Sequence, residues 1–150
     1  MKVMKAGILP TSLVVAQFVL MPVLILFGYR QVFASLFLQI MAGASILLMA
    51  NSILAMKLKY LRITPSPGEN HELCTRGAYR WIRHPMYSAG LLLCGSFTIG
   101  ANTMGSTGLW ILLFMTLYMK ARVEEKLWLA SSRSYAPYMS NTKMFVPLLF

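Results

Sequence analysis

Long apolar stretches without charged residues dominate the chain. Residues 6–29, 31–56 and 85–119 contain no Lys, Arg, Asp or Glu. A helix needs roughly 20 apolar residues to cross the hydrocarbon core of a bilayer. The first two intervals therefore each predict one transmembrane helix, over residues 8–28 and 33–56.

The third apolar interval is too long for one helix and contains residues that favour a turn. Two of its glycines, Gly100 and Gly108, bracket a run that also holds Asn, Ser and Thr. Because Gly, Asn and Ser favour turns, we predict a helical hairpin with arms over residues 86–101 and 107–121. The predicted fold is one all-α membrane domain over residues 1–150, with four transmembrane helices and a cytoplasmic C-terminal segment over residues 122–150.

Composition agrees with a membrane protein, because 57% of the residues are hydrophobic and only 12% are charged. A soluble domain is typically about 45–50% apolar and about 25% charged. We therefore expect the bilayer to be a partner of this chain. The two histidines and two cysteines show no metal-ligand spacing, so no metal site is predicted. The oligomeric state stays open.

The net charge of +10 is divided among several segments. With four transmembrane helices, thirteen of the fourteen basic residues fall on one side, and only Arg30 falls on the other. The positive-inside rule makes the basic side, and with it both termini, cytoplasmic; in a bacterium this would be the inner membrane. Nucleic-acid binding is not expected, although a basic net charge can indicate it, because the basic residues are distributed as the positive-inside rule requires of a membrane protein.

A dense polar cluster lies at the start of the third apolar interval. Residues 76–90 hold three arginines, one histidine and two tyrosines. Polar side chains are costly at a membrane boundary, so this density suggests a polar ligand or reaction. Pro85 suits the first turn of a helix, whose free N–H groups would favour a carboxylate or phosphate. The alternative is an interfacial anchor that contacts lipid headgroups.

Half of the acidic residues, Glu124 and Glu125, follow the fourth predicted helix. The inner ends of a hairpin are neighbours, so these carboxylates would approach Arg83 and His84. Such a combination suits a zwitterionic, amino-acid-like ligand. Helical spacing predicts that one carboxylate faces the site and the other faces solvent, and that Arg122 can pair with Glu125. The alternative is a solvated helix face.

Several of these residues recur in one family pattern. Its positions are Leu73, Thr75, Gly77 and Tyr79, then Arg83, His84, Pro85 and Tyr87, then Glu124 and Glu125, then Tyr135, Tyr138 and Pro147. With this pattern the chain resembles the integral-membrane methyltransferases of the isoprenylcysteine carboxyl methyltransferase and phospholipid methyltransferase superfamily. The resemblance covers roughly residues 73–147. Two departures are Ala89, where the family usually has Gly, and the lack of Phe-Gly before Tyr135.

The resemblance implies S-adenosylmethionine as cofactor, bound in a cytoplasmic pocket at the end of the hairpin. The expected acceptor is lipophilic: an isoprenylcysteine-type carboxylate, a phospholipid amine, or a small thiol or acid. Glu125 and Arg122 are the expected catalytic residues. The expected cofactor-binding residues are Tyr79, Arg83, His84, Pro85, Tyr87, Glu124, Glu125 and Tyr135. Two alternatives are a membrane reductase with a nicotinamide cofactor and a non-catalytic, lipid-binding adaptor.

Overall fold

The computed structural model describes residues 8–56 and 73–147, which form helices joined by short connections. The elements are α1 (Ile8–Ala34), α2 (Leu36–Met56), the 3-10 helix η2 (Gly77–Arg80), α3 (Pro85–Ala101), α4 (Met104–Ser131) and α5 (Tyr135–Asn141). The predicted all-α fold is confirmed for the described residues. The predicted basic loop between the second and third spans lies mostly outside them, as do the basic residues near the N-terminus.

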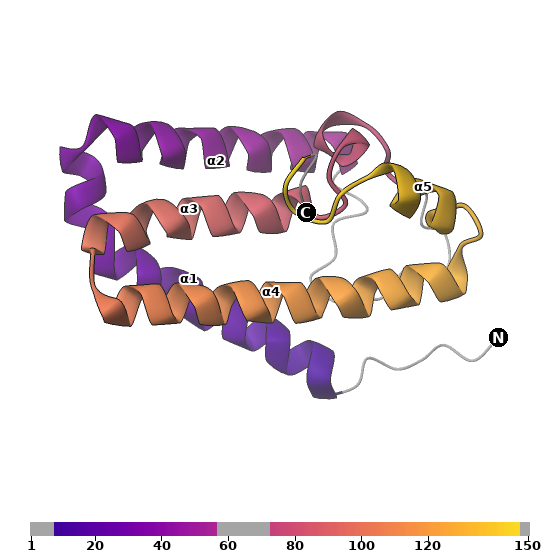
Figure 1. The fold of residues 1–150 in the computed structure, drawn as a ribbon, viewed down its shortest axis with the longest axis horizontal. Coiled ribbons are helices and arrows are strands. Elements are labelled where there is room, and N and C mark those ends of the chain that lie inside the picture. Colours follow the sequence, from indigo (N-terminus) through magenta and orange to yellow (C-terminus); the bar gives the residue numbers. More distant parts are fainter. Residues whose placement is uncertain (1–7, 57–72, 148–150) are drawn as a thin grey trace.

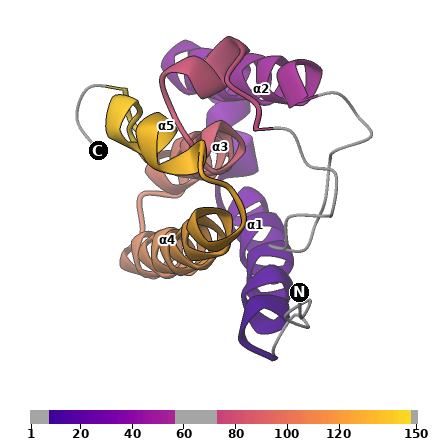
Figure 2. The same cartoon turned by 90° about the vertical axis from the view of Figure 1, so that its right-hand side faces the viewer.

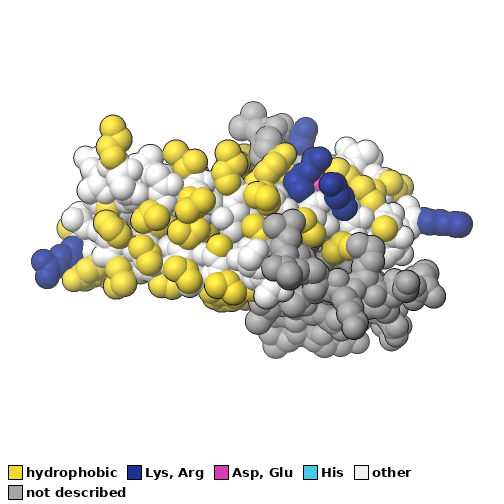
Figure 3. All heavy atoms as spheres, turned by 90° about the horizontal axis from the view of Figure 1, so that it is seen from below, with side chains coloured by type: hydrophobic (Ala, Val, Ile, Leu, Met, Phe, Trp, Pro, Cys, Tyr) yellow, Lys and Arg dark blue, Asp and Glu magenta, His cyan; other side chains and the backbone are white. Residues whose placement is uncertain are grey.

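Among the described residues, two helices are long and apolar enough to cross a membrane. They are the segments Thr11–Ala34 of α1 and Leu36–Met56 of α2, with mean hydropathies of 2.2 and 1.8. Large apolar side chains point outward from both, as Leu26 in α1 and Leu54 in α2 show with 70% and 80% exposure. Apolar side chains are spread over the face shown in Figure 3, while basic side chains lie at its left end and over its right-hand half.

The helices α2, α3 and α4 run side by side along the long axis of the molecule, and α1 crosses them (Figure 1). Figure 1 shows α2, α3 and α4 nearly aligned, whereas α1 passes obliquely behind them. In the view of Figure 2 the N-terminal end of α1 extends beyond the other helices. The largest buried cluster joins α1, α3 and α4 and consists of Leu20, Leu24, Leu91, Cys94, Leu113 and Leu117.

Close contact between α1 and α3 depends on Gly28. A Cβ atom added there would lie 1.9 Å from the backbone oxygen of Phe97, which is far inside contact distance. Glycine therefore allows the two backbones to approach, as small residues do in packed membrane helices. This contact brings α1 against the hairpin and so positions its N-terminal half beside α4.

The hairpin between α3 and α4 forms, but its turn is shorter than predicted. Asn102 adopts a left-handed conformation (φ 48°, ψ 43°), and Thr103 begins α4 with a capping box to Ser106. These two residues complete the reversal, so α4 begins at Met104 and includes Gly105 and Gly108. The predicted start at residue 107 is wrong because the turn signal extended into the helix.

Two further boundaries also differ from the prediction. The helix α1 continues to Ala34, and α2 begins at Leu36, so the first break falls at Ser35 rather than near residue 30. The helix α4 continues to Ser131, beyond residue 121, where the predicted membrane span ends. Its buried face continues through Leu117, Ala121 and Glu125 at four-residue spacing, which explains why the helix persists beyond the apolar interval.

Candidate functional site

The start of α3 and the charged part of α4 meet in a polar cluster of five residues. These are Arg83, His84, Tyr87, Glu124 and Glu125. Arg83 and His84 precede α3, Tyr87 lies in its first turn, and both glutamates lie in α4. The predicted proximity of these two segments is confirmed, because an ion pair between Arg83 and Glu125 and a hydrogen bond between Tyr87 and Glu124 join them directly.

Arg83 and Glu125 form a buried ion pair at the centre of this polar cluster. The Arg83 Nε donates to Glu125 Oε1 at 2.6 Å, and the two side chains are only 9% and 3% exposed. The Arg83 Nη1 donates to the backbone oxygens of Met139 (3.1 Å) and Thr142. Arg83 therefore connects α4 to the C-terminal end of α5.

The environment of Glu125 keeps it ionised despite its burial. Burial by itself raises the pKa of this carboxyl, but the neighbouring His84 and Arg83 together hold the pKa below its ordinary value. Opposite charges and hydrogen bonds to the ionised form both act in this direction. The site therefore contains a carboxylate that stays negative at neutral pH.

His84 lies between the two glutamates. Its Nδ1 is 3.5 Å from Glu124 Oε2, and its Nε2 is 3.5 Å from Glu125 Oε1. The imidazole stacks on Tyr87 with the ring centroids 5.2 Å apart and the planes 6° from parallel. The Tyr87 hydroxyl donates to Glu124 Oε1 at 2.5 Å, so this network orients both the imidazole and the carboxylates.

Both glutamates face the polar cluster, which corrects the prediction that one of them faces solvent. The Glu124 side chain is 19% exposed, and that of Glu125 is 3% exposed. Adjacent helical residues point about 100° apart. Glu124 and Glu125 can nevertheless flank the side of α4 that faces α3, and both side chains are long enough to reach the residues at the start of α3.

Two buried polar atoms of the polar cluster have no hydrogen-bond partner within the described part of the chain. They are His84 Nε2 and Glu125 Oε2. Buried polar groups are nearly always paired, so an unpaired one calls for an explanation. An imidazole nitrogen and a carboxylate oxygen side by side can bind complementary polar groups of a ligand.

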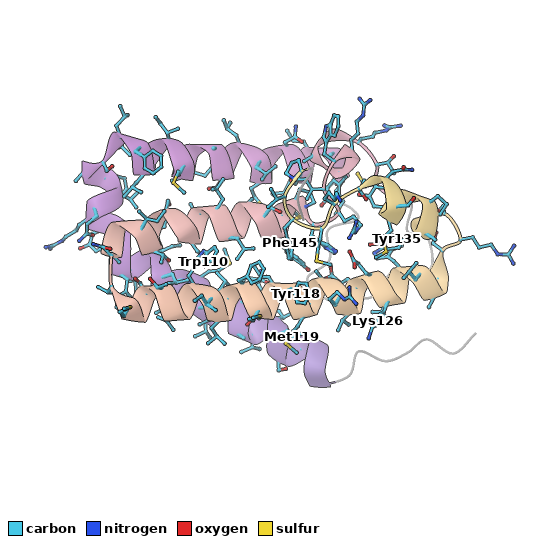
Figure 4. All side chains as sticks on the ribbon, viewed as in Figure 1. Trp110, Tyr118, Met119, Lys126, Tyr135 and Phe145 are labelled. Carbon is cyan, nitrogen blue, oxygen red and sulfur yellow. The ribbon has the colours of Figure 1, made fainter. Side chains whose placement is uncertain are left out.

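The C-terminal segment is held against the start of α3 by backbone hydrogen bonds. The Arg83 N–H donates to the Lys143 oxygen (2.8 Å), and the His84 N–H donates to the Met144 oxygen (3.1 Å). The Ser88 hydroxyl donates to the Phe145 oxygen at 2.6 Å. Figure 4 shows Phe145 between α3 and α4. These contacts enclose one side of the polar cluster.

Tyrosines form the border of the site toward η2 and α5. Tyr79 and Tyr135 are buried, with 6% and 2% exposure, and burial raises the pKa of each hydroxyl. The Tyr138 hydroxyl donates to the Tyr79 backbone oxygen at 2.8 Å. Tyr135 stacks on Trp128 with the ring centroids 5.7 Å apart. These neutral aromatic residues join α4, α5 and η2 beside the buried ion pair.

The start of η2 is fitted to α2 by Gly77. This glycine has φ +57°, and a Cβ there would lie 2.8 Å from Asn51 Oδ1. The same oxygen accepts a hydrogen bond from the Ala78 N–H at 2.8 Å. Glycine is favoured at such a position because it adopts positive φ without a steric penalty.

Most of the predicted site residues lie together, with one clear exception. Pro85 is buried at the first position of α3, next to the polar cluster. Arg122 is exposed, and Glu125 pairs with Arg83 instead. The predicted pair between Arg122 and Glu125 is therefore wrong, because helical spacing identified a possible neighbour but not the buried cation across the hairpin.

Sequence reasoning did not place three residues at the site: Phe145 and Lys120 contact the polar cluster, and Gln17 contacts Lys120. Phe145 approaches His84 with the ring centroids 6.1 Å apart. Lys120 lies over the Tyr87 ring, with Nζ 5.0 Å from its centroid, and donates to Gln17 Oε1 at 3.0 Å. A polar residue inside an apolar span is a recognisable signal, so Gln17 could have been singled out.

Fold and site together define a helical protein with long apolar helices and a buried ionic network at one end of a hairpin. A family model described as phospholipid methyltransferase matches residues 38–135, which is more than half of the chain. The chain belongs to this family, within the isoprenylcysteine and phospholipid methyltransferase membrane superfamily, so the predicted resemblance is confirmed. The match includes the complete polar cluster. No curated protein and no solved structure matches the chain.

Proposed function

We propose that the protein transfers a methyl group from S-adenosylmethionine to a lipophilic acceptor at the cytoplasmic face of a membrane. Membership of a methyltransferase family supports the reaction class. The observation that carries the proposal is the buried polar cluster, in which opposite charges accompany two polar atoms that have no hydrogen-bond partner among the described residues.

The polar cluster has the chemistry to bind the amino-acid end of this cofactor. Glu125 Oε2 is an unpaired oxygen on an ionised carboxylate, which suits an ammonium group. His84 Nε2 lies 3.5 Å from Glu125 Oε1 without a hydrogen bond, and it can donate to a carboxylate of a ligand when it is protonated. Arg83 already binds Glu125 and two backbone oxygens, so we assign it a positioning role.

The proposed reaction asks little acid–base chemistry of the protein. When bound, the cofactor supplies an electrophilic methyl group on its sulfonium sulfur. The protein then has to hold the acceptor in line and exclude water. A carboxylate or thiolate acceptor needs no general base, whereas an amine acceptor has to lose a proton. Tyr79, Tyr135 and the C-terminal segment around Phe145 border the polar cluster and limit access of water to it.

The proposed membrane arrangement has four spans with both termini in the cytoplasm. The helix α3 has 17 residues and α4 has 28, so they extend about 26 and 42 Å. The charged end of α4 would leave the hydrocarbon core, which is about 30 Å thick. The polar cluster would then lie at the cytoplasmic boundary, where a cofactor from the cytosol and an acceptor from the bilayer can meet.

Calorimetry on the purified protein in a neutral detergent tests this proposal against its two alternatives. We expect S-adenosylhomocysteine to bind and NADPH not to bind. Binding of NADPH alone would indicate a reductase, and binding of neither would indicate an adaptor. Incubation with radiolabelled S-adenosylmethionine and total host lipid would then show which lipid fraction accepts the methyl group.

A further inference from the structure

Lys120 is a buried cation that the proposed reaction does not yet use. It is 4% exposed, and its Nζ donates to a neutral acceptor, Gln17 Oε1, at 3.0 Å. Among the described residues no carboxylate lies within 4.0 Å of this nitrogen. Burial of a charge without an ionic partner is costly, and ionisable residues in apolar helical segments commonly mark functional sites.

The position of Lys120 connects the polar cluster to the apolar interior. It precedes Glu124 by four residues on α4, so it lies about 6 Å further along the helix on the same face. Its Nζ lies over one ring of the polar cluster, that of Tyr87, which in turn stacks on His84. A cation therefore lies one helical turn deeper than the proposed cofactor site.

The contact between Lys120 and Gln17 lies at the seam between α4 and α1. The preceding residue, Met119, is 47% exposed and lies where α4 passes α1 (Figure 4). Toward its N-terminus α1 extends beyond the other helices (Figure 2). Gln17 is only partly buried there. Its neutral amide oxygen can be replaced by a stronger, anionic acceptor that approaches along this seam.

We propose that Lys120 Nζ binds an anionic oxygen, of a phosphate or a carboxylate, on the lipophilic methyl acceptor. This inference rests on the proposed function and narrows its substrate class to acidic amphiphiles. Uncharged alkyl thiols and alcohols lack the group that Lys120 would bind. The acyl or prenyl chain of the acceptor would contact the apolar surfaces of α1 and α4, while its anionic group replaces Gln17 at the ammonium.

The test measures binding of three amphiphiles of equal chain length to the protein in neutral detergent micelles. Dodecyl phosphate and dodecanoate carry the two anionic groups, and dodecanol is the uncharged control. We expect Lys120→Met to weaken binding of at least one anionic probe about tenfold or more, without changing dodecanol binding. A larger loss of affinity for dodecyl phosphate would indicate that Lys120 binds a phosphate, and a larger loss for dodecanoate would indicate that it binds a carboxylate.

Lys126→Met is the matched control, because Lys126 is an exposed lysine on the same helix. It should change each affinity less than about twofold. Equal losses in the two lysine variants would mean that diffuse positive charge attracts the probes, and would overturn the proposal. Unchanged affinity for both anionic probes in folded Lys120→Met would do the same.

Gln17→Leu keeps the proposal testable if Lys120→Met does not fold. It removes the competing acceptor, so an anionic probe should bind more tightly than to the wild type; unchanged or weaker binding would count against the proposal. S-adenosylhomocysteine is titrated in parallel against the wild type. If S-adenosylhomocysteine does not bind but Lys120→Met weakens binding of an anionic probe, only the proposed cofactor is refuted. If S-adenosylhomocysteine binds but Lys120→Met leaves probe binding unchanged, only the acceptor assignment is refuted.

Discussion

The ion pair between Arg83 and Glu125 should be a major contribution to the stability of the hairpin. The side chains are 9% and 3% exposed, so removal of one partner leaves a buried, uncompensated charge. Such a change typically costs about 3–5 kcal/mol. In Glu125→Gln the guanidinium keeps the backbone oxygens of Met139 and Thr142, so we expect the lower end, about 3 kcal/mol.

A double-mutant cycle with Arg83→Met measures the interaction itself. The double variant removes both charges, so its loss of stability should be smaller than the sum of the single losses by about 2 kcal/mol. Glu124→Gln is the control, because its side chain is 19% exposed and its amide oxygen can still accept the Tyr87 hydroxyl. We expect it to cost about 1 kcal/mol or less.

The measurement is reversible unfolding in mixed micelles, titrated with sodium dodecyl sulfate and followed by tryptophan fluorescence. Trp128 stacks on Tyr135 near the ion pair and reports on this region. A coupling free energy within about 0.5 kcal/mol of zero would refute the reasoning. It would mean that the Arg83 guanidinium is held by the backbone of α5 rather than by the Glu125 carboxylate.

Four further predictions address the site, pH dependence, packing and topology. His84→Ala should lower the affinity for S-adenosylhomocysteine about tenfold or more by calorimetry, and unchanged affinity would return this residue to a lipid-anchor role. Folding lowers the Glu125 pKa, so the ionised carboxylate should stabilise the fold at pH values above 4.5, the ordinary pKa of this group, and this contribution should be lost as the pH falls below that value. A difference in unfolding free energy between the wild type and Glu125→Gln that stays constant in acid would contradict this. Gly28→Ala should cost about 1–3 kcal/mol in the same unfolding assay, whereas Gly43→Ala, with no atom within 4 Å of the added Cβ, should not destabilise. A reporter fused to the C-terminus should be active only in its cytoplasmic form, and a strong signal from the opposite side would exclude the four-span arrangement.

Much of the candidate site could be predicted because its residues carry local signals. Pro85 marks the start of a helix, and the charges beside it stand out against the apolar chain. The glutamate pair follows the second arm of a hairpin, so hairpin geometry brings it to His84. The identity of the side-chain partners could not be predicted in this way. The choice of Arg83 over Arg122 as the partner of Glu125 depends on how α4 rotates about its axis against α3.

Periodicity, turn propensity and charge act over short stretches of chain, so the helical class, the apolar segments, the hairpin and the residues that gather at its inner ends could be predicted from the sequence. Three features arise instead from long-range packing: both glutamates face α3, residues near Lys143 enclose the site, and Lys120 meets Gln17, 103 positions away in sequence. These contacts depend on the crossing of α1, which the Gly28 contact with α3 permits, and on the return of the chain after α5. Such long-range packing leaves no periodic pattern in the sequence.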